Sequence, residues 1–178
     1  MSKLESKIVE GLRDIFDYRE KFDVVLACAF EPEEKGNEKF NFYKKIGRVI
    51  RSIRKKPYLP HKEINLNWPP EKIYDISNEI VIPCSDIVIG YLGLQSCAAG
   101  IMIGSAFKNK IPVSYLYEKE VGLDSLKFGL TDLTTGKTEI EDPGWMGEIY
   151  DLIEFENEGE ALLKLKLSLE AFYKQKIT

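Results

Sequence analysis

Long hydrophobic runs, clustered cysteines and a second histidine are all missing from this chain. No apolar stretch approaches the roughly 20 residues that a membrane-spanning helix needs, and the N-terminus lacks the apolar segment of a signal peptide. The 3 cysteines show no metal-binding spacing, and a single histidine argues against a transition-metal site. We therefore expect a soluble, cytoplasmic protein with reduced thiols, no membrane contact, no metal and no cofactor.

An excess of charge of one sign is also missing. The sequence has 25 Lys and Arg against 29 Asp and Glu, a net charge of −4, so we do not expect a polyanion as its main partner. One run of basic residues has no acid within it: Lys44, Lys45, Arg48, Arg51, Arg54, Lys55 and Lys56. We interpret this run as a solvated helix face, and a nucleic-acid or phosphate surface is the less favoured alternative.

Apolar periodicity indicates strands that alternate with helices. The predicted strands are 22–30, 57–61, 86–92, 111–117 and 150–155. The predicted helices are 3–20, 40–53, 97–109 and 157–175, with a further helix that opens at Pro69-Pro70-Glu71 and stops before Pro83. The prolines of 57–61 favour the edge of a sheet. Residues 119–147 have no clear pattern and are predicted to form an irregular insert.

Strands that are apolar almost throughout imply a parallel sheet covered on both faces. The expected fold is therefore α/β, a doubly wound (flavodoxin- or Rossmann-like) parallel sheet of about five strands with helices on both faces and an extra N-terminal helix at 1–20. The 178 residues fit a single domain spanning 1–178. Ligands of such sheets bind beyond the carboxyl ends of the strands, where the strand order switches.

The segment from Asp86 to Ala106 carries the strongest signal of a site. It is predicted to form a buried strand, a turn of small residues and a helix that opens on Ser96. A helix N-terminus at this edge favours an anionic or sugar-bearing ligand. Gly93 and Gly100 leave the backbone accessible, while Ser96 serves either as the helix N-cap, its commoner role, or as a donor to a phosphate. The segment is neither a dinucleotide fingerprint nor a P-loop.

Four stretches of the sequence occur in a characteristic order. They are Leu26-Ala27-Cys28-Ala29-Phe30, then Ser85-Asp86 before Ile87-Val88-Ile89, then residues 96–106 (Ser-Cys-Ala-Ala-Gly-Ile-Met-Ile-Gly-Ser-Ala), and last Ile111-Pro112-Val113. In order and spacing they resemble the nucleoside 2-deoxyribosyltransferase family, which includes deoxynucleoside monophosphate N-glycosidases. The resemblance covers more than half of the chain. It implies a small-molecule nucleoside or nucleotide as ligand and a homo-oligomeric assembly, while nucleic acid stays an unfavoured partner on the charge balance given above.

The resemblance also implies a pair of catalytic carboxylates, and this chain lacks both. The family's nucleophilic glutamate matches Met102, and its sugar-holding aspartate matches Asn78. Neither side chain ionises, and the loss of a covalent nucleophile costs orders of magnitude in rate. The ligand-binding residues that we expect from the resemblance and from the segment above are Phe30, His61, Asn78, Asp86, Gly93, Ser96, Gly100 and Met102.

Three functions are compatible with this pattern, and we favour the first. The first is a nucleoside- or nucleotide-binding protein with a degenerate site and no glycosyl transfer. The second is an active deoxyribosyltransferase or deoxynucleotide N-glycosidase that uses a relocated acid. Candidates for that acid are Glu79, through a slip of one residue, Asp75 and Glu118. The third is a structural or interaction protein whose N-terminal helix and 119–147 insert serve assembly.

Overall fold

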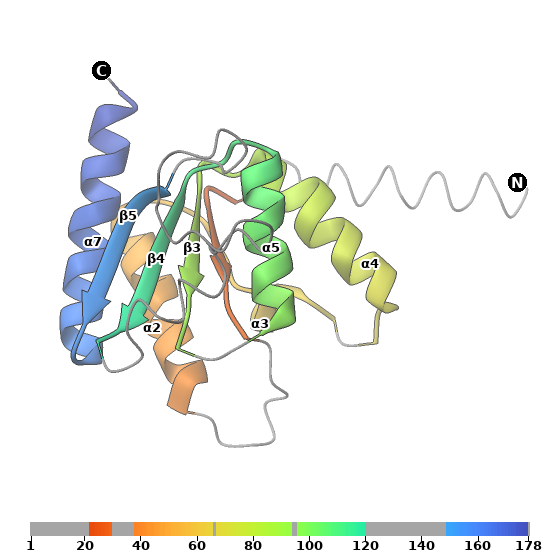
Figure 1. Ribbon diagram of the computed structural model, residues 1–178, viewed down its shortest axis with the longest axis horizontal. Helices are drawn as coiled ribbons and strands as arrows, with labels where there is room; N and C mark the ends of the chain where they lie inside the picture. The colour runs from red at the N-terminus through yellow and green to blue at the C-terminus, as the bar shows by residue number, and fades with distance from the viewer. Residues whose placement is uncertain (1–21, 30–37, 66, 94–95, 120–148, 178) are drawn as a thin grey trace, which may run out of the picture.

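The computed structural model describes residues 22–29, 38–65, 67–93, 96–119 and 149–177 (Figure 1). The predicted helix at 3–20, Phe30 and residues 120–147 of the predicted insert lie outside these ranges. Within the described ranges, no helix combines the length and the apolar character that crossing a membrane requires.

Five parallel strands form the sheet, in the order β2-β1-β3-β4-β5. Their bounds are β1 (Val24–Ala27), β2 (Pro57–Tyr58), β3 (Ile87–Tyr91), β4 (Val113–Glu118) and β5 (Ile149–Phe155). Every residue of β1 and of β3 is buried, because helices cover both faces of the sheet. In register, Val25 of β1 lies between Tyr58 of β2 and Val88 of β3. The predicted doubly wound α/β fold is confirmed.

The helices divide between the two faces of this sheet (Figure 1). Helices α2 (Glu38–Ser52) and α7 (Glu158–Gln175) pack with Val24 and Leu26 of β1 in one buried cluster. Helix α5 (Cys97–Lys108) and the helical segment 70–84 pack with Val25 and Ala27 in another. Alternate residues of β1 thus face opposite layers, as the pleat of a strand requires.

The strand order places a topological switch beside β1. The chain leaves β1, passes through α2 to β2 on one side, and then returns through segment 70–84 to β3 on the other side. Right-handed crossovers that run in opposite directions put their helices on opposite faces. The connections that follow β1 and β3 therefore lead away from each other, to opposite faces of the sheet. The space between the carboxyl ends of these two strands is where such sheets bind ligands.

Segment 57–63 differs from its prediction in one respect. The expected strand 57–61 is confined to β2, and a short helix α3 (Pro60–Glu63) begins at Pro60. The fixed φ of proline suits the first turn of a helix, so Pro60 ends the strand and starts α3. His61 is therefore on a helix and not at a strand end.

Segment 70–84 is one continuous helical stretch of changing pitch. It consists of α4 (Pro70–Tyr74), the π-helix η2 (Asp75–Val81) and the 3₁₀ turn η3 (Ile82–Cys84). The prediction that this helix stops before Pro83 is wrong, since Pro83 lies inside the 3₁₀ turn. The wide turn of η2 pairs the N–H of Ile82 with the carbonyl of Ser77, five residues back, which is the π pattern.

The wide turn changes which donor is available to the next carbonyl, that of Asn78. Its π-helical donor would be the N–H of Pro83, and proline has none. The hydroxyl of Ser105 on α5 donates to this carbonyl instead, over 2.7 Å. A buried hydrogen bond between two helices thus compensates for the proline and fixes η2 against α5.

Candidate ligand-binding site

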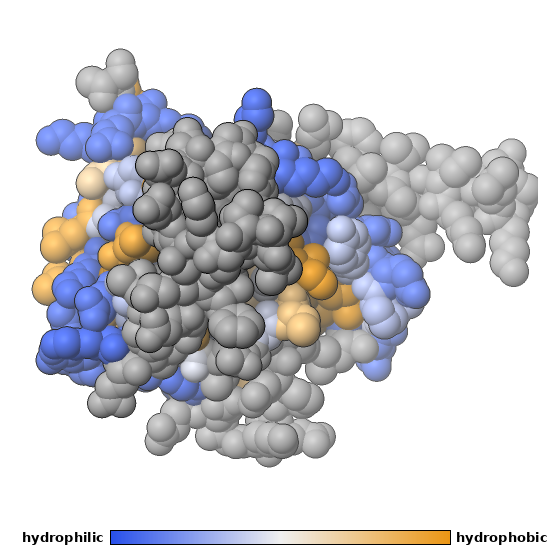
Figure 2. All heavy atoms as spheres, in the orientation of Figure 1, coloured by the Kyte–Doolittle hydropathy of each residue, from blue (hydrophilic) through white to orange (hydrophobic). Residues whose placement is uncertain are grey.

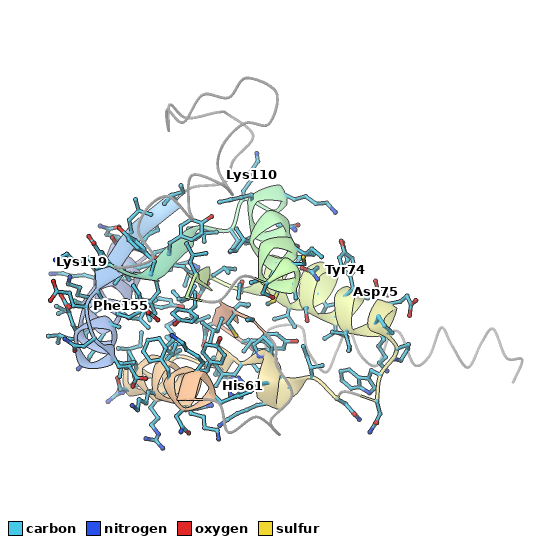
Figure 3. The ribbon with its side chains drawn as sticks, turned by 60° about the horizontal axis from the view of Figure 1, so that its bottom comes forward. His61, Tyr74, Asp75, Lys110, Lys119 and Phe155 are labelled. Atoms are coloured by element: carbon cyan, nitrogen blue, oxygen red, sulfur yellow. The ribbon has the colours of Figure 1, made fainter. Side chains whose placement is uncertain are left out.

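A cavity of about 600 Å³ lies at the carboxyl end of β1, between α5, α3 and segment 70–78. This volume falls in the range of small-molecule sites. Most of its wall is apolar and comes from Cys28, Pro60, Ile64, Pro70, Ile73, Tyr74, Ala98, Ile101 and Met102. The polar lining residues are Glu71, Asp75, Ser77 and Asn78. In Figure 3, Tyr74 and Asp75 lie on the helical segment beside α5.

Met102 and Asn78 both line this cavity. Met102 comes from α5 and is 5% exposed, and Asn78 comes from η2 and is 3% exposed. The hydrogen bond from Ser105 to the Asn78 carbonyl holds the two elements together at this point. Two of the residues expected at a ligand are therefore brought to one cavity, where they present a thioether and an amide.

Asn78 has one hydrogen-bonding group in use and one without a partner. Its Nδ2 donates to the carbonyl of Tyr74 over 3.1 Å. Its Oδ1 is buried and accepts no hydrogen bond within the described part of the chain. A buried acceptor without a partner costs free energy. The neighbouring Ser77 differs, since its hydroxyl pairs with the Tyr58 hydroxyl at 2.9 Å.

The turn and helix start after β3 play structural parts. Ser96 is the N-cap of α5, and its Oγ accepts the N–H of Ala99 at 3.3 Å. Gly93 makes room for Tyr91, because a side chain at 93 would collide with the Tyr91 ring and hydroxyl. Gly100 is exposed and faces open space. None of the residues Gly93, Ser96 and Gly100 lines the cavity, whereas Ala98 and Ile101 of the same helix do.

Two further expected ligand residues lie elsewhere. Asp86 precedes β3 at the opposite, amino edge of the sheet, where it forms ion pairs with Lys176 and Lys55. His61 lies on α3 (Figure 3), with its ring 5.4 Å from that of Phe40 and 5.8 Å from that of Tyr43. Neither Asp86 nor His61 is part of the cavity wall.

The three candidates for a relocated acid are separated by the structure. Glu79 is exposed and forms an ion pair with Lys108 at 3.5 Å. Glu118 ends β4 and is engaged by Lys39 at 2.5 Å and by the Tyr91 hydroxyl at 2.7 Å. Asp75 alone of the three lines the cavity. Sequence reasoning missed Glu71, whose spacing of four residues from Asp75 on one helix was the available signal.

Burial raises the pKa of two side chains near the carboxyl edge of the sheet, and one of them, Cys28, lines the cavity. Burial raises the pKa of the Cys28 thiol to about 12, against a smaller opposing effect of a hydrogen bond with Tyr43. Cys28 is therefore a neutral thiol in the cavity wall at physiological pH. Burial, and then the nearby Glu118 carboxylate, raise the pKa of Tyr91. Within the described residues, no group of three or more His, Cys, Asp or Glu side chains is arranged to hold a metal ion.

The fold and the cavity together define a parallel α/β protein with a mainly apolar pocket beside its topological switch. No family model and no characterised protein matches the amino-acid sequence. Among solved structures, the protein is similar to the CMP N-glycosidase BcmB of Clostridium botulinum, with 18% identity and a TM-score of 0.58 over 82% of this chain and 98% of that one. It is also similar to a conserved protein from Enterococcus faecalis V583, with 15% identity and a TM-score of 0.52 over the same shares. These likenesses show a shared fold.

Proposed function

We propose that the protein binds a nucleoside or nucleotide in this cavity and does not catalyse the glycosyl transfer of the family it resembles. The observation that carries the proposal is the presence of Met102 and Asn78 on the wall of one cavity at the switch in strand order. The fold shared with a CMP N-glycosidase supports a nucleotide-related ligand.

The chemistry of the wall favours binding over catalysis. Cleavage of a glycosidic bond through a covalent intermediate uses one carboxylate as nucleophile and a second group as acid and base. Met102 offers a polarisable apolar surface that suits the face of a base, and Asn78 offers an uncharged acceptor. Neither supplies a negative charge to an oxocarbenium-like transition state.

Isothermal titration calorimetry with the common nucleosides and their 5′-monophosphates tests the binding. We expect Ala98→Trp to abolish it, because Ala98 is an exposed residue on the cavity wall and an indole there fills the space. Cys97→Trp is the matched control, since Cys97 is its exposed neighbour in the same turn and does not line the cavity. The absence of heat and of any melting shift across the whole panel would refute the proposal.

Chromatography of the free base tests the claim about catalysis. We expect the wild-type protein to release no base above the uncatalysed rate from nucleosides or their monophosphates. The Met102→Glu/Asn78→Asp double variant introduces the two carboxylates that the family resemblance implies and is expected to gain measurable hydrolysis. Turnover by the wild-type protein, with no further gain in the double variant, would contradict this part of the proposal.

An active N-glycosidase is the second candidate function, and the position of Asp75 on the cavity wall favours it. In that case the wild-type protein releases base, and Asp75→Asn removes the activity. Glu79→Gln is the control, because Glu79 lies on the same helical segment but pairs with Lys108 outside the cavity. Equal loss in both variants would reject Asp75 as the acid.

A homo-oligomer is part of the proposal and follows from the family resemblance. The side of the molecule where α7 and β5 lie carries hydrophobic surface (Figure 2). Leu163 and Leu167 of α7 are four residues apart on one face of the helix, and their exposed fractions are 59% and 57%. Exposed apolar patches often mark association sites. Sedimentation velocity is expected to show an oligomer that dissociates in the Leu163→Lys/Leu167→Lys variant, and a monomeric wild-type protein would contradict the expectation.

A further inference from the structure

We propose that the cavity selects an uncharged or cationic ligand that carries hydrogen-bond donors, and therefore prefers a nucleoside to its 5′-phosphate. This inference rests on the proposed function and specifies the ligand of the same site. Two independent features of the wall carry it: a pair of carboxylates on one helical face, and a buried acceptor without a partner.

The carboxylates are those of Glu71 and Asp75. They are four residues apart on consecutive helical turns, so they project from one face, and both line the cavity. No Lys or Arg is found among the described residues that line it. The adjacent Lys72 is directed elsewhere, with its Nζ 5.0 Å from the centre of the Trp68 ring. The charge of the wall is therefore negative at neutral pH.

The N-terminus of α5 is the opposing influence, because helix N-termini attract phosphate. Its dipole corresponds to about half of a positive charge, whereas Glu71 and Asp75 contribute a full negative charge each. Ser96 already accepts the N–H of Ala99, which removes one of the free donors of that terminus. The balance in the cavity is thus unfavourable for a phosphate dianion.

Asn78 adds a requirement for donors. Its side chain is 3% exposed and lines the cavity, and its Oδ1 accepts no hydrogen bond within the described residues. Its Nδ2 is already engaged by the Tyr74 carbonyl, so the side chain is left with an acceptor to offer. The oxygen is enclosed by protein atoms, so a sugar hydroxyl or base amino group donates to it once the side chain turns toward the cavity, whereas a deprotonated phosphate only accepts.

Matched ligand pairs test the selection, with cytidine against CMP and adenosine against AMP. Calorimetry at low salt is expected to show each nucleoside bound about tenfold or more tightly than its monophosphate, because both carboxylates repel the dianion through solvent. The ratio should shrink at high salt, which screens the repulsion.

Variants separate the carboxylates from the rest of the wall. Glu71→Gln/Asp75→Asn is expected to reduce the nucleoside preference to near unity. Glu71→Gln and Asp75→Asn made singly should each reduce the ratio in part, and Glu79→Gln is their matched control, because it also removes one charge from the same helical segment but lies outside the cavity wall and should leave the ratio unchanged. Asn78→Leu should weaken nucleoside binding by about tenfold, as expected when a hydrogen bond from ligand to protein is lost.

The outcomes distinguish this inference from the proposed function. Equal or tighter binding of the monophosphates, or a ratio that the Glu71→Gln/Asp75→Asn variant does not change, overturns the inference and leaves the proposed function standing. Failure of every nucleoside and nucleotide to bind overturns the proposed function itself. Circular dichroism melts of each variant establish that it is folded, and the salt dependence in the wild-type protein gives a test that needs no variant.

Discussion

Tyr91, Lys39 and Glu118 form a hydrogen-bonded cluster at the carboxyl ends of β3 and β4. The Lys39 ammonium lies 2.9 Å from the Tyr91 hydroxyl and 2.5 Å from the Glu118 carboxylate, and Tyr91 donates to Glu118 over 2.7 Å. Gly93 permits this arrangement, because a side chain there would occupy the space of the Tyr91 ring. The cluster fastens the start of α2 to two neighbouring strands.

Glu118 makes this fastening dependent on pH. Partial burial raises its pKa, but the hydrogen bonds from Lys39 and Tyr91 and the charge of Lys39 outweigh burial, so the net pKa lies below the ordinary value of 4.5. A carboxylate with a lowered folded-state pKa contributes stability above its unfolded pKa, and this is lost as pH falls through the folded value. We expect the free energy of unfolding to decrease as pH falls below about 4.5.

Urea unfolding of Glu118→Gln tests this dependence. The variant is expected to be less stable than the wild-type protein at pH 7 and to lose less stability than the wild type as pH falls below 4.5. Glu154→Gln, which changes an exposed residue of β5, serves as the control. An identical pH profile for Glu118→Gln and the wild-type protein would show that the cluster contributes nothing to the pH dependence.

Cys28 gives a prediction about reactivity. Its pKa of about 12 leaves a very small fraction of thiolate, the reactive form, and its side chain is buried, whereas Cys97 is exposed. With iodoacetamide at pH 8, mass spectrometry of the peptides is expected to show Cys97 modified first and Cys28 about a hundredfold more slowly. Both should react in urea. Labelling of Cys28 as fast as Cys97 in the folded protein would contradict its assignment as an inert wall residue.

The sequence predicted the position of some candidate ligand residues and not of others. Met102 and Asn78 are predicted as ligand residues from a resemblance in motif order and spacing, which links separate elements, and both line the cavity. Glu71 also lines the cavity, and the sequence did not predict it as a ligand residue. Asp86 was expected at the ligand but lies at the amino edge of the sheet. The position of Asp86 follows from strand direction, because a residue that precedes a parallel strand lies at the amino edge.

The elements that local pattern determines were predicted closely. The apolar run of β3 and the Ser96 cap with the helix behind it are set by neighbouring residues, and their predicted bounds hold to within one or two residues. The end of segment 70–84 was predicted wrongly. The rule that a helix stops before proline considers only neighbouring residues, and here the helical stretch continues through Pro83. The compensation comes from Ser105 on another helix, a contact that local sequence does not reveal.

Ser105 provides the prediction at this scale. Ser105→Ala removes the hydrogen bond from the Ser105 hydroxyl to the buried Asn78 carbonyl, and we expect the free energy of unfolding to fall by about 1–2 kcal/mol. Ser168→Ala is the matched control, since Ser168 is also a buried helical serine and its hydroxyl has no partner among the described residues. Ser168→Ala is expected to change stability by about 0.5 kcal/mol or less.

Urea unfolding measures both serine variants. A loss of the same size in Ser105→Ala and Ser168→Ala would indicate that the hydroxyl of Ser105 contributes only through packing. Ser105→Thr keeps a donor at the same position, and substantial recovery of stability in that variant relative to Ser105→Ala would support the hydrogen bond as the cause.

In the molecule as a whole, the carboxyl edge and the amino edge of the sheet carry different features. The carboxyl edge carries the cavity, while the amino edge carries a cluster of charges between segments far apart in sequence. Lys55, after α2, lies 3.9 Å from both Asp23 and Asp86 and 3.9 Å from the centre of the Tyr173 ring of α7. Asp86 also pairs with Lys176 at the end of the same helix. This cluster joins α2 and α7 to the starts of β1 and β3.

Asp86→Asn tests the division between the edges. The substitution keeps the shape of the side chain and removes its charge from two lysines, and partly exposed ion pairs of this kind contribute modestly, so we expect a loss of about 1 kcal/mol in the free energy of unfolding. Ligand affinity by calorimetry should stay at the wild-type value, because the amino edge is separated from the cavity by the length of β3. Ala98→Trp should show the reverse, with affinity lost and stability retained, since Ala98 is exposed and its replacement disturbs no buried contact. A loss of affinity in Asp86→Asn without a loss of stability would mean that Asp86 acts on the ligand after all, and that the site extends through the sheet to its opposite edge.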